Sequence, residues 1–130
     1  MFHIRGSCGV ADTKHHHFYR TGGTEPYGHT VKNVTKYGPD GFLEDLPELL
    51  TSRSGHACAG YYKGDVFLHL VAGGWSGYGD GDILTSTELF EDSKWRFAQP
   101  LPLPITGAKA TTISNNIFLL GGRIIYYHIY

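Results

Sequence analysis

Short runs of strand-forming residues, each followed by turn-forming residues, recur along this 130-residue chain. The run DVFLHLVA leads into the glycine pair Gly73-Gly74, the run NIFLL leads into Gly121-Gly122, and the run HHHFYRT leads into Gly22-Gly23. Glycine beside a strand costs conformational entropy and adds no side chain to packing. Three such pairs at similar intervals therefore indicate a repeated structural unit.

The interval between the glycine pairs predicts the kind of unit. Gly22 and Gly73 are 73 − 22 = 51 residues apart, and Gly73 and Gly121 are 121 − 73 = 48 residues apart. One blade of a β-propeller, a small sheet of four antiparallel strands, takes about 40–50 residues. The spacing favours an all-β chain built from such blades.

Aromatic residues recur in phase with the glycines. Phe90 lies 17 residues after Gly73, Tyr37 lies 15 residues after Gly22, and each is followed five residues later by another ring, Trp95 and Phe42. Large rings remove much apolar area from water, so we expect them to fill the space between neighbouring sheets.

These features predict blade boundaries. Strands are expected near residues 56–62, 66–72, 85–90 and 95–98, which together make one complete blade over 55–104. A partial blade is expected over 15–54 and another over 105–122. Residues 1–14 and 123–130 fit no part of the pattern and are left unassigned. The segment LEDLPELLTS has leucines at helical spacing, but the proline in its middle argues against a helix.

The pattern resembles the kelch-repeat family of β-propellers. The resemblance is carried by the glycine pairs at 73–74 and 121–122, by Glu88-Leu89-Phe90, by Trp95, and by the segments RSGHACAGYY and LPLPITGAKATTI. It covers about residues 15–122 and departs from the family at Phe42, where a tryptophan is expected. It implies a partial kelch-type β-propeller made of four-stranded antiparallel blades.

The resemblance also implies a function. Such propellers are non-enzymatic protein-protein interaction modules that serve in substrate recognition or as scaffolds, and they need no cofactor. Their partners bind loops that follow the glycine pairs or connect the blades, and loops on rigid scaffolds commonly carry function. The residues expected to contact a protein partner are Arg53, Trp75, Tyr78, Asp80, Asp82 and Arg123.

Two alternatives to this function stay open. One is a remnant of a galactose-oxidase-like copper propeller enzyme, in which a tyrosine is cross-linked to a cysteine; the chain has tyrosines and Cys58 but no ordered motif. The other is a secreted kelch-repeat protein. No metal site is expected, because neither the His15–His17 run nor Asp80 and Asp82 have ligand spacing.

Composition and charge narrow the partners and the compartment. The formal net charge of −1 gives no basic field for nucleic acid, and no run is long and apolar enough for a membrane helix. With no recognisable signal peptide, the chain is expected to be cytoplasmic, with Cys8 and Cys58 as free, buried thiols. An incomplete propeller has open sheet edges, which predicts self-association, and the apolar segment RIIYYHIY could contribute to it.

Overall fold

The structure, a computed structural model, describes residues 5–77, 82–122 and 126–128. Within these ranges every regular element is a strand. The first sheet contains four antiparallel strands in chain order, β1 (Cys8–Asp12), β2 (His17–Thr21), β3 (Val34–Gly38) and β4 (Gly41–Leu46).

The second sheet repeats this plan. Its strands are β5 (Ala57–Lys63), β6 (Val66–Ala72), β9 (Thr87–Glu91) and β10 (Lys94–Phe97). The short strands β7 (Trp75–Ser76) and β8 (Asp82–Ile83) lie between β6 and β9 in the chain and pair with each other as a separate two-stranded sheet. The third sheet contains β11 (Ala108–Ile113), β12 (Asn116–Gly121) and β13 (Tyr126–His128).

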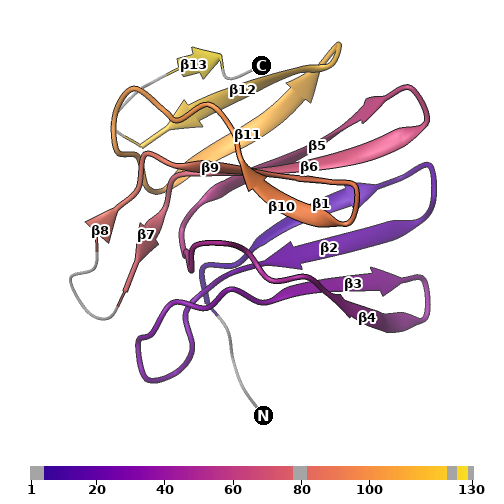
Figure 1. Cartoon of the computed structure of the whole chain (residues 1–130), viewed down its shortest axis with the longest axis horizontal. Helices are drawn as coiled ribbons and strands as arrows, with labels where there is room; N and C mark the ends of the chain where they lie inside the picture. The colour runs from indigo at the N-terminus through magenta and orange to yellow at the C-terminus, as the bar shows by residue number, and fades with distance from the viewer. Residues whose placement is uncertain (1–4, 78–81, 123–125, 129–130) are drawn as a thin grey trace.

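The sheets are stacked as in a partial β-propeller (Figure 1). The first strand of each sheet lies innermost, with β5 in contact with both β1 and β11. The all-β fold of four-stranded antiparallel sheets predicted from the sequence is therefore present. In the second sheet, the ends of all four main strands lie within two residues of the predicted ends.

The glycine pairs lie at equivalent places, at the end of the second strand of each sheet. Gly22 and Gly73 have φ angles of 60° and 66°, in the left-handed region that favours glycine. A Cβ at Gly22 would lie 2.3 Å from the carbonyl oxygen of Arg53, and one at Gly73 would lie 2.4 Å from that of Ile105. The repeated pairs are needed because the segment that leads into the next sheet passes too close for a side chain.

The aromatic pairs also share one register. Tyr37 lies opposite Phe42 in the first sheet, and Phe90 lies opposite Trp95 in the second. The prediction that Phe42 and Trp95 occupy like places in successive sheets is confirmed.

Two segments left unassigned by the sequence contribute strands. Residues 8–12 form β1, so the first sheet has four strands instead of the partial blade expected to begin at residue 15. β13 lies within the unassigned segment 123–130. A five-residue strand such as β1 carries little local signal, and its pairing with β2 and its contact with β5 define it only in the folded chain.

Two junctions between sheets form the hydrophobic core. The first junction, between the first and second sheets, buries Val10, Val34, Leu49, Cys58, Val71 and Trp95. The second junction, between the second and third sheets, buries two groups of mostly aliphatic residues that include Ala57, Leu70, Leu101, Ile105, Ile117 and Leu119.

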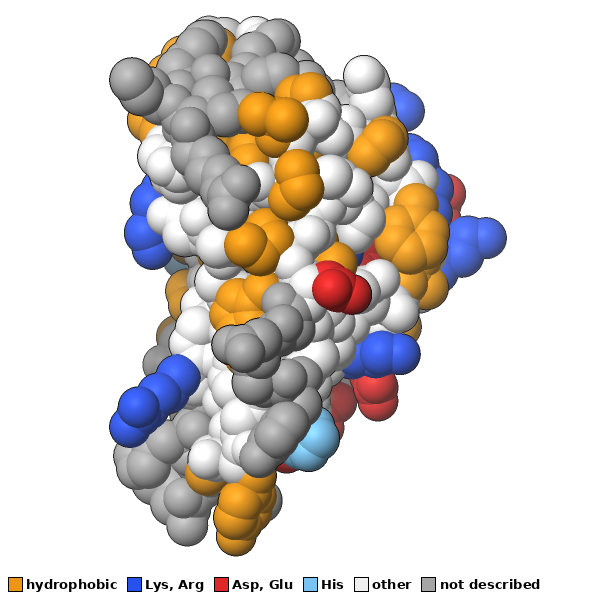
Figure 2. All heavy atoms as spheres, turned by 90° about the vertical axis from the view of Figure 1, so that its left-hand side faces the viewer, with side chains coloured by type: hydrophobic (Ala, Val, Ile, Leu, Met, Phe, Trp, Pro, Cys, Tyr) orange, Lys and Arg blue, Asp and Glu red, His pale blue; other side chains and the backbone are white. Residues whose placement is uncertain are grey.

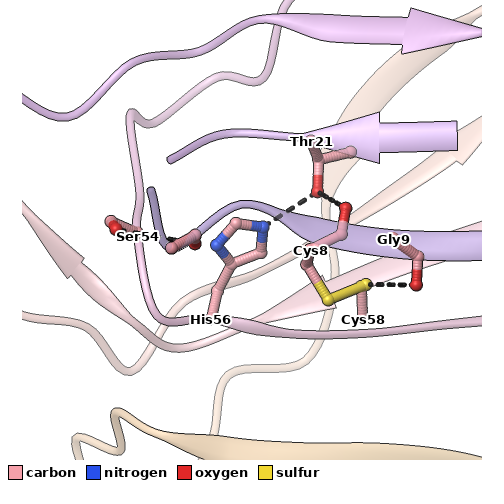
Figure 3. The surroundings of a disulfide bond; sticks show 7 residues. Cys8, Gly9, Thr21, Ser54, His56 and Cys58 are labelled. Atoms are coloured by element: carbon pink, nitrogen blue, oxygen red, sulfur yellow. Dashed lines mark hydrogen bonds between the residues drawn. A yellow bond between two sulfur atoms is a disulfide. The ribbon is translucent and has the colours of Figure 1, made fainter. Parts of the chain in front are cut away.

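A disulfide between Cys8 and Cys58 crosses the first junction (Figure 3). It joins the innermost strands of two sheets, and the two cysteines are 50 residues apart in the chain. The expectation of two free thiols was wrong, because positions near the start of successive blades, far apart in sequence, become neighbours when the sheets stack.

Candidate functional site

The loops of the three sheets divide between two ends of the molecule. The loops after the glycine pairs and the connections between sheets lie on the left in Figure 1, and the tight turns within each sheet lie on the right. We call the first of these ends the loop face; among the described residues it consists of 22–33, 47–56, 73–77, 82–86 and 98–107. Figure 2 views the molecule from this side and shows hydrophobic side chains in a broken row along it.

A series of hydrogen-bonded hydroxyl groups holds three of these loops together. The Ser52 hydroxyl lies 2.7 Å from the Thr30 hydroxyl and 2.8 Å from the Ser76 hydroxyl. The Gly77 backbone N–H donates to Thr30 Oγ1 at 2.9 Å. These bonds connect the loop after β2, the connection between the first two sheets and the end of β7, so the loops are fixed relative to one another.

A buried ion pair fixes the connection between the first two sheets. The Arg53 guanidinium donates to Glu88 Oε2 at 2.7 Å, and neither side chain is exposed to solvent. Arg53 also donates to the carbonyl oxygens of Gly73 and Ser86. Burial lowers the pKa of Arg53, and the neighbouring Glu88 carboxylate opposes that shift.

The other carboxylate contacts of Glu88 fix the connection between the sheets. Glu88 accepts the backbone N–H groups of Leu50 and Thr51 at 2.6 and 3.1 Å. The expectation that Arg53 contacts a partner was therefore wrong: the side chain is fully buried, where it satisfies backbone carbonyls and one carboxylate. A loop arginine is ordinarily exposed, and the sequence did not reveal its distant carboxylate partner.

Of the other residues predicted to contact a partner, the structure describes two. Trp75 is half-buried in β7, where its backbone pairs with that of Ser54, and Asp82 is exposed at the start of β8. Trp75 and Asp82 both lie on the loop face, on the paired strands β7 and β8. Tyr78, Asp80 and Arg123 lie outside the described residues.

The most exposed apolar residues of the loop face were missed by the sequence reasoning. Tyr27 is 77% exposed and Leu103 is 49% exposed, and Leu50 and Ile83 are also exposed. The available signal was the prolines beside two of them, in EPYGH and PLPLP, which hold the backbone in extended or turn conformations.

Two histidines are buried at the first junction. His56 Nε2 lies 2.8 Å from the Thr21 hydroxyl (Figure 3), and the ring of His69 packs against Tyr19 and Trp95. Burial lowers the pKa of each to about 3, and the Arg53 charge contributes further to the shift of His56. Both rings are therefore neutral in the folded chain near pH 7.

The described residues contain no group of three or more histidine, cysteine, aspartate or glutamate side chains that could hold a metal ion. No helix among them is long and apolar enough to cross a membrane.

Comparison with known proteins supports the fold. No family model matches the chain, and no curated protein does. A solved structure titled "Structure of YjhT" is similar, with a TM-score of 0.77 and 13% sequence identity over 93% of this chain. The chain corresponds to 39% of the length of that protein. At this level of identity the similarity shows a shared fold.

Proposed function

We propose that this chain is part of a kelch-type β-propeller and that its loop face binds a protein partner without catalysing a reaction. The observation that carries the proposal is the combination of a fixed loop scaffold with exposed apolar side chains. The hydroxyl bonds of Ser52 and the ion pair of Arg53 hold the loops, while Tyr27 and Leu103 project from them.

The energetics of interfaces support this proposal. Aromatic residues are enriched among the residues that dominate binding energy, and their rigid rings lose little conformational entropy when they are buried by a partner. A scaffold that is already fixed also avoids part of the ordering cost of association. Tyr27, Trp75 and Leu103 are therefore the residues expected to contribute most.

A peptide-display selection tests the proposed binding face. The protein would be immobilised through an added terminal tag, and a library of random 12-residue peptides would be screened against it. We expect the selected peptides to bind at least 10-fold more weakly to Tyr27→Ala and Leu103→Ala variants. Val66→Ala, which removes an exposed side chain at the opposite end of the second sheet, is the matched control.

Circular dichroism spectra and thermal melting must first show that all three variants fold. Binding that is insensitive to the two loop-face variants, or a selection that yields no binding peptide, would refute the proposal.

The disulfide favours a secreted kelch-repeat protein over a cytoplasmic one, because disulfides persist in oxidising compartments. It also argues against the copper-enzyme alternative, since Cys58 is already bonded to Cys8 and is not available for a cross-link to tyrosine. The measurement is a thiol titration of denatured protein purified without reductant from its natural source. We expect no reactive thiol, and two thiols per chain would contradict the assignment.

A further inference from the structure

Each terminal sheet has one face that no neighbouring sheet of the described chain covers. In the first sheet this face is turned away from the second sheet and includes Phe18, Tyr37 and Phe42. In the third sheet it is turned away from the second and includes Thr111, Ile113 and Leu120. We call these the leading face and the trailing face.

The leading face repeats, position by position, a face that is buried within the molecule. Tyr37 and Phe42 occupy the places that Phe90 and Trp95 occupy in the second sheet, as the two registers show. There, Trp95 packs against the first sheet and donates its indole N–H to the Pro47 carbonyl at 2.9 Å. The leading face therefore has the aromatic pattern of a surface that stacks on another sheet.

The exposure of equivalent residues shows how much of this pattern is left uncovered. Phe42 is 62% exposed, whereas Trp95 is 6% exposed. Phe18 is exposed beside Tyr37, with 6.1 Å between the ring centroids. Together these rings form an exposed apolar patch at the point where the stacking direction of the sheets continues, and such patches commonly mark interaction sites.

The trailing face shows the same relation to the second sheet. Leu120 directly precedes the glycine pair of the third sheet and is 43% exposed; Ala72 directly precedes the pair of the second sheet and is 4% exposed. Ile113, two register positions beyond Thr111 on the same face, is 59% exposed. Aliphatic groups on this face would meet the aromatic rings of a leading face.

We propose that the leading face of one copy stacks on the trailing face of a second copy, and the reverse, to form a closed ring of two chains. Such a ring would continue the sheet stacking already present at both junctions. Two copies of three sheets give 2 × 3 = 6 blades, within the range of about 4–8 at which propellers close. Each interface is head-to-tail, and the rotation closes the ring after two copies.

Sedimentation equilibrium and multi-angle light scattering test this assembly. We expect the unmodified chain to have twice the mass of one chain at micromolar concentration. Phe42→Glu on the leading face and Ile113→Glu on the trailing face should each increase the dissociation constant at least 100-fold. Val66→Glu, which places the same charge on an exposed apolar residue outside both faces, should leave the dimer unchanged.

Mixing the two disrupted variants distinguishes head-to-tail stacking from other arrangements. The mixture contains one unaltered leading face and one unaltered trailing face, so one interface can form and dimers should reappear in part. A chain that is monomeric at all concentrations would overturn the proposal and indicate that other sheets cover these faces. A dimer broken by Phe42→Glu but not by Ile113→Glu would also overturn it, as would a ladder of larger oligomers.

Discussion

The two junctions between sheets use different chemistry to hold the same geometry. The second junction is formed mainly by aliphatic residues such as Leu101, Ile105 and Leu119. The first junction adds to its apolar core a disulfide, a buried ion pair and two buried histidines. At the position equivalent to Arg53, before the hydroxyl-glycine dipeptide that opens the second and the third sheet, the second junction has Ile105.

This difference shows that the glycine placement is common to both junctions, whereas the surrounding residues can vary. Gly22 and Gly73 make the same close approach to the following segment in both places, whether that segment carries Arg53 or Ile105. The first junction should therefore respond to reductant and to acid, and the second should not. Four changes test what stabilises the first junction, from the largest expected effect to the smallest.

Trp95→Ala should lower the free energy of unfolding by about 5 kcal/mol, because it leaves a cavity between the first two sheets and removes the indole donor from the Pro47 carbonyl. Urea unfolding of dilute, monomeric protein measures the change. Phe42→Ala, at the equivalent but exposed place, should change it by less than about 0.5 kcal/mol. Equal losses for the two variants would show that position in the sheet, and not burial, sets the cost.

Loss of the Cys8–Cys58 disulfide should lower the stability by about 4 kcal/mol, as the loop-entropy relation gives for a loop of this length. The double variant Cys8→Ala/Cys58→Ala and the reduced unmodified protein should unfold at the same, lower urea concentration. Reductant should have no effect on the double variant. If reduction leaves the unfolding midpoint of the unmodified protein unchanged, the disulfide does not stabilise the first junction.

Arg53→Met should cost about 3 kcal/mol, because it leaves the Glu88 carboxylate buried without its cationic partner. Replacing both residues, as Arg53→Met/Glu88→Met, should recover part of this loss, since an apolar pair carries no desolvation cost. Thermal unfolding of the two variants measures the difference. A double variant less stable than Arg53→Met would show that the backbone contacts of Glu88 matter more than its charge.

Acid should destabilise the first junction selectively. The folded pKa of His56 and His69 is lowered from 6.5 to about 3, so below pH 6.5 the unfolded chain binds more protons and stability falls as pH falls. At pH 5 each histidine should account for a loss of about 2 kcal/mol relative to pH 7.

Urea unfolding at pH 5 and pH 7 measures this effect. His69→Leu should reduce the pH dependence by about half, and Val66→Ala, a change at an exposed residue that does not titrate, should not alter it. The same pH dependence in His69→Leu and the unmodified protein would contradict the assignment.

The repeated features of the fold could be predicted from the sequence because their causes are local. Gly73 and Trp95 stand at fixed distances within a blade, and each requirement, left-handed backbone or a large ring, selects a residue type directly. The place of such a residue within its sheet could be predicted in this way, but its burial could not. Phe42 matches Trp95 in register but not in burial, since burial depends on a neighbouring sheet.

The polar features of the first junction could not be predicted because their causes are distant in sequence. Arg53 reaches a carboxylate 35 residues away, and Cys8 bonds to a cysteine 50 residues away. Tyr27 on the loop face was missed for a related reason: it belongs to a long loop after a glycine pair, and its position beside the other loops follows from hydroxyl contacts such as Thr30 to Ser52.

The Glu88 carboxylate has a consequence for the shape of any larger assembly. It lies on a central strand of the second sheet and receives two amide hydrogens from the segment that leaves the first sheet. These hydrogen bonds, together with side-chain packing, fix the angle between the two sheets. Because equal steps must add up to a full turn, this single side chain helps to dictate how many blades complete the circle.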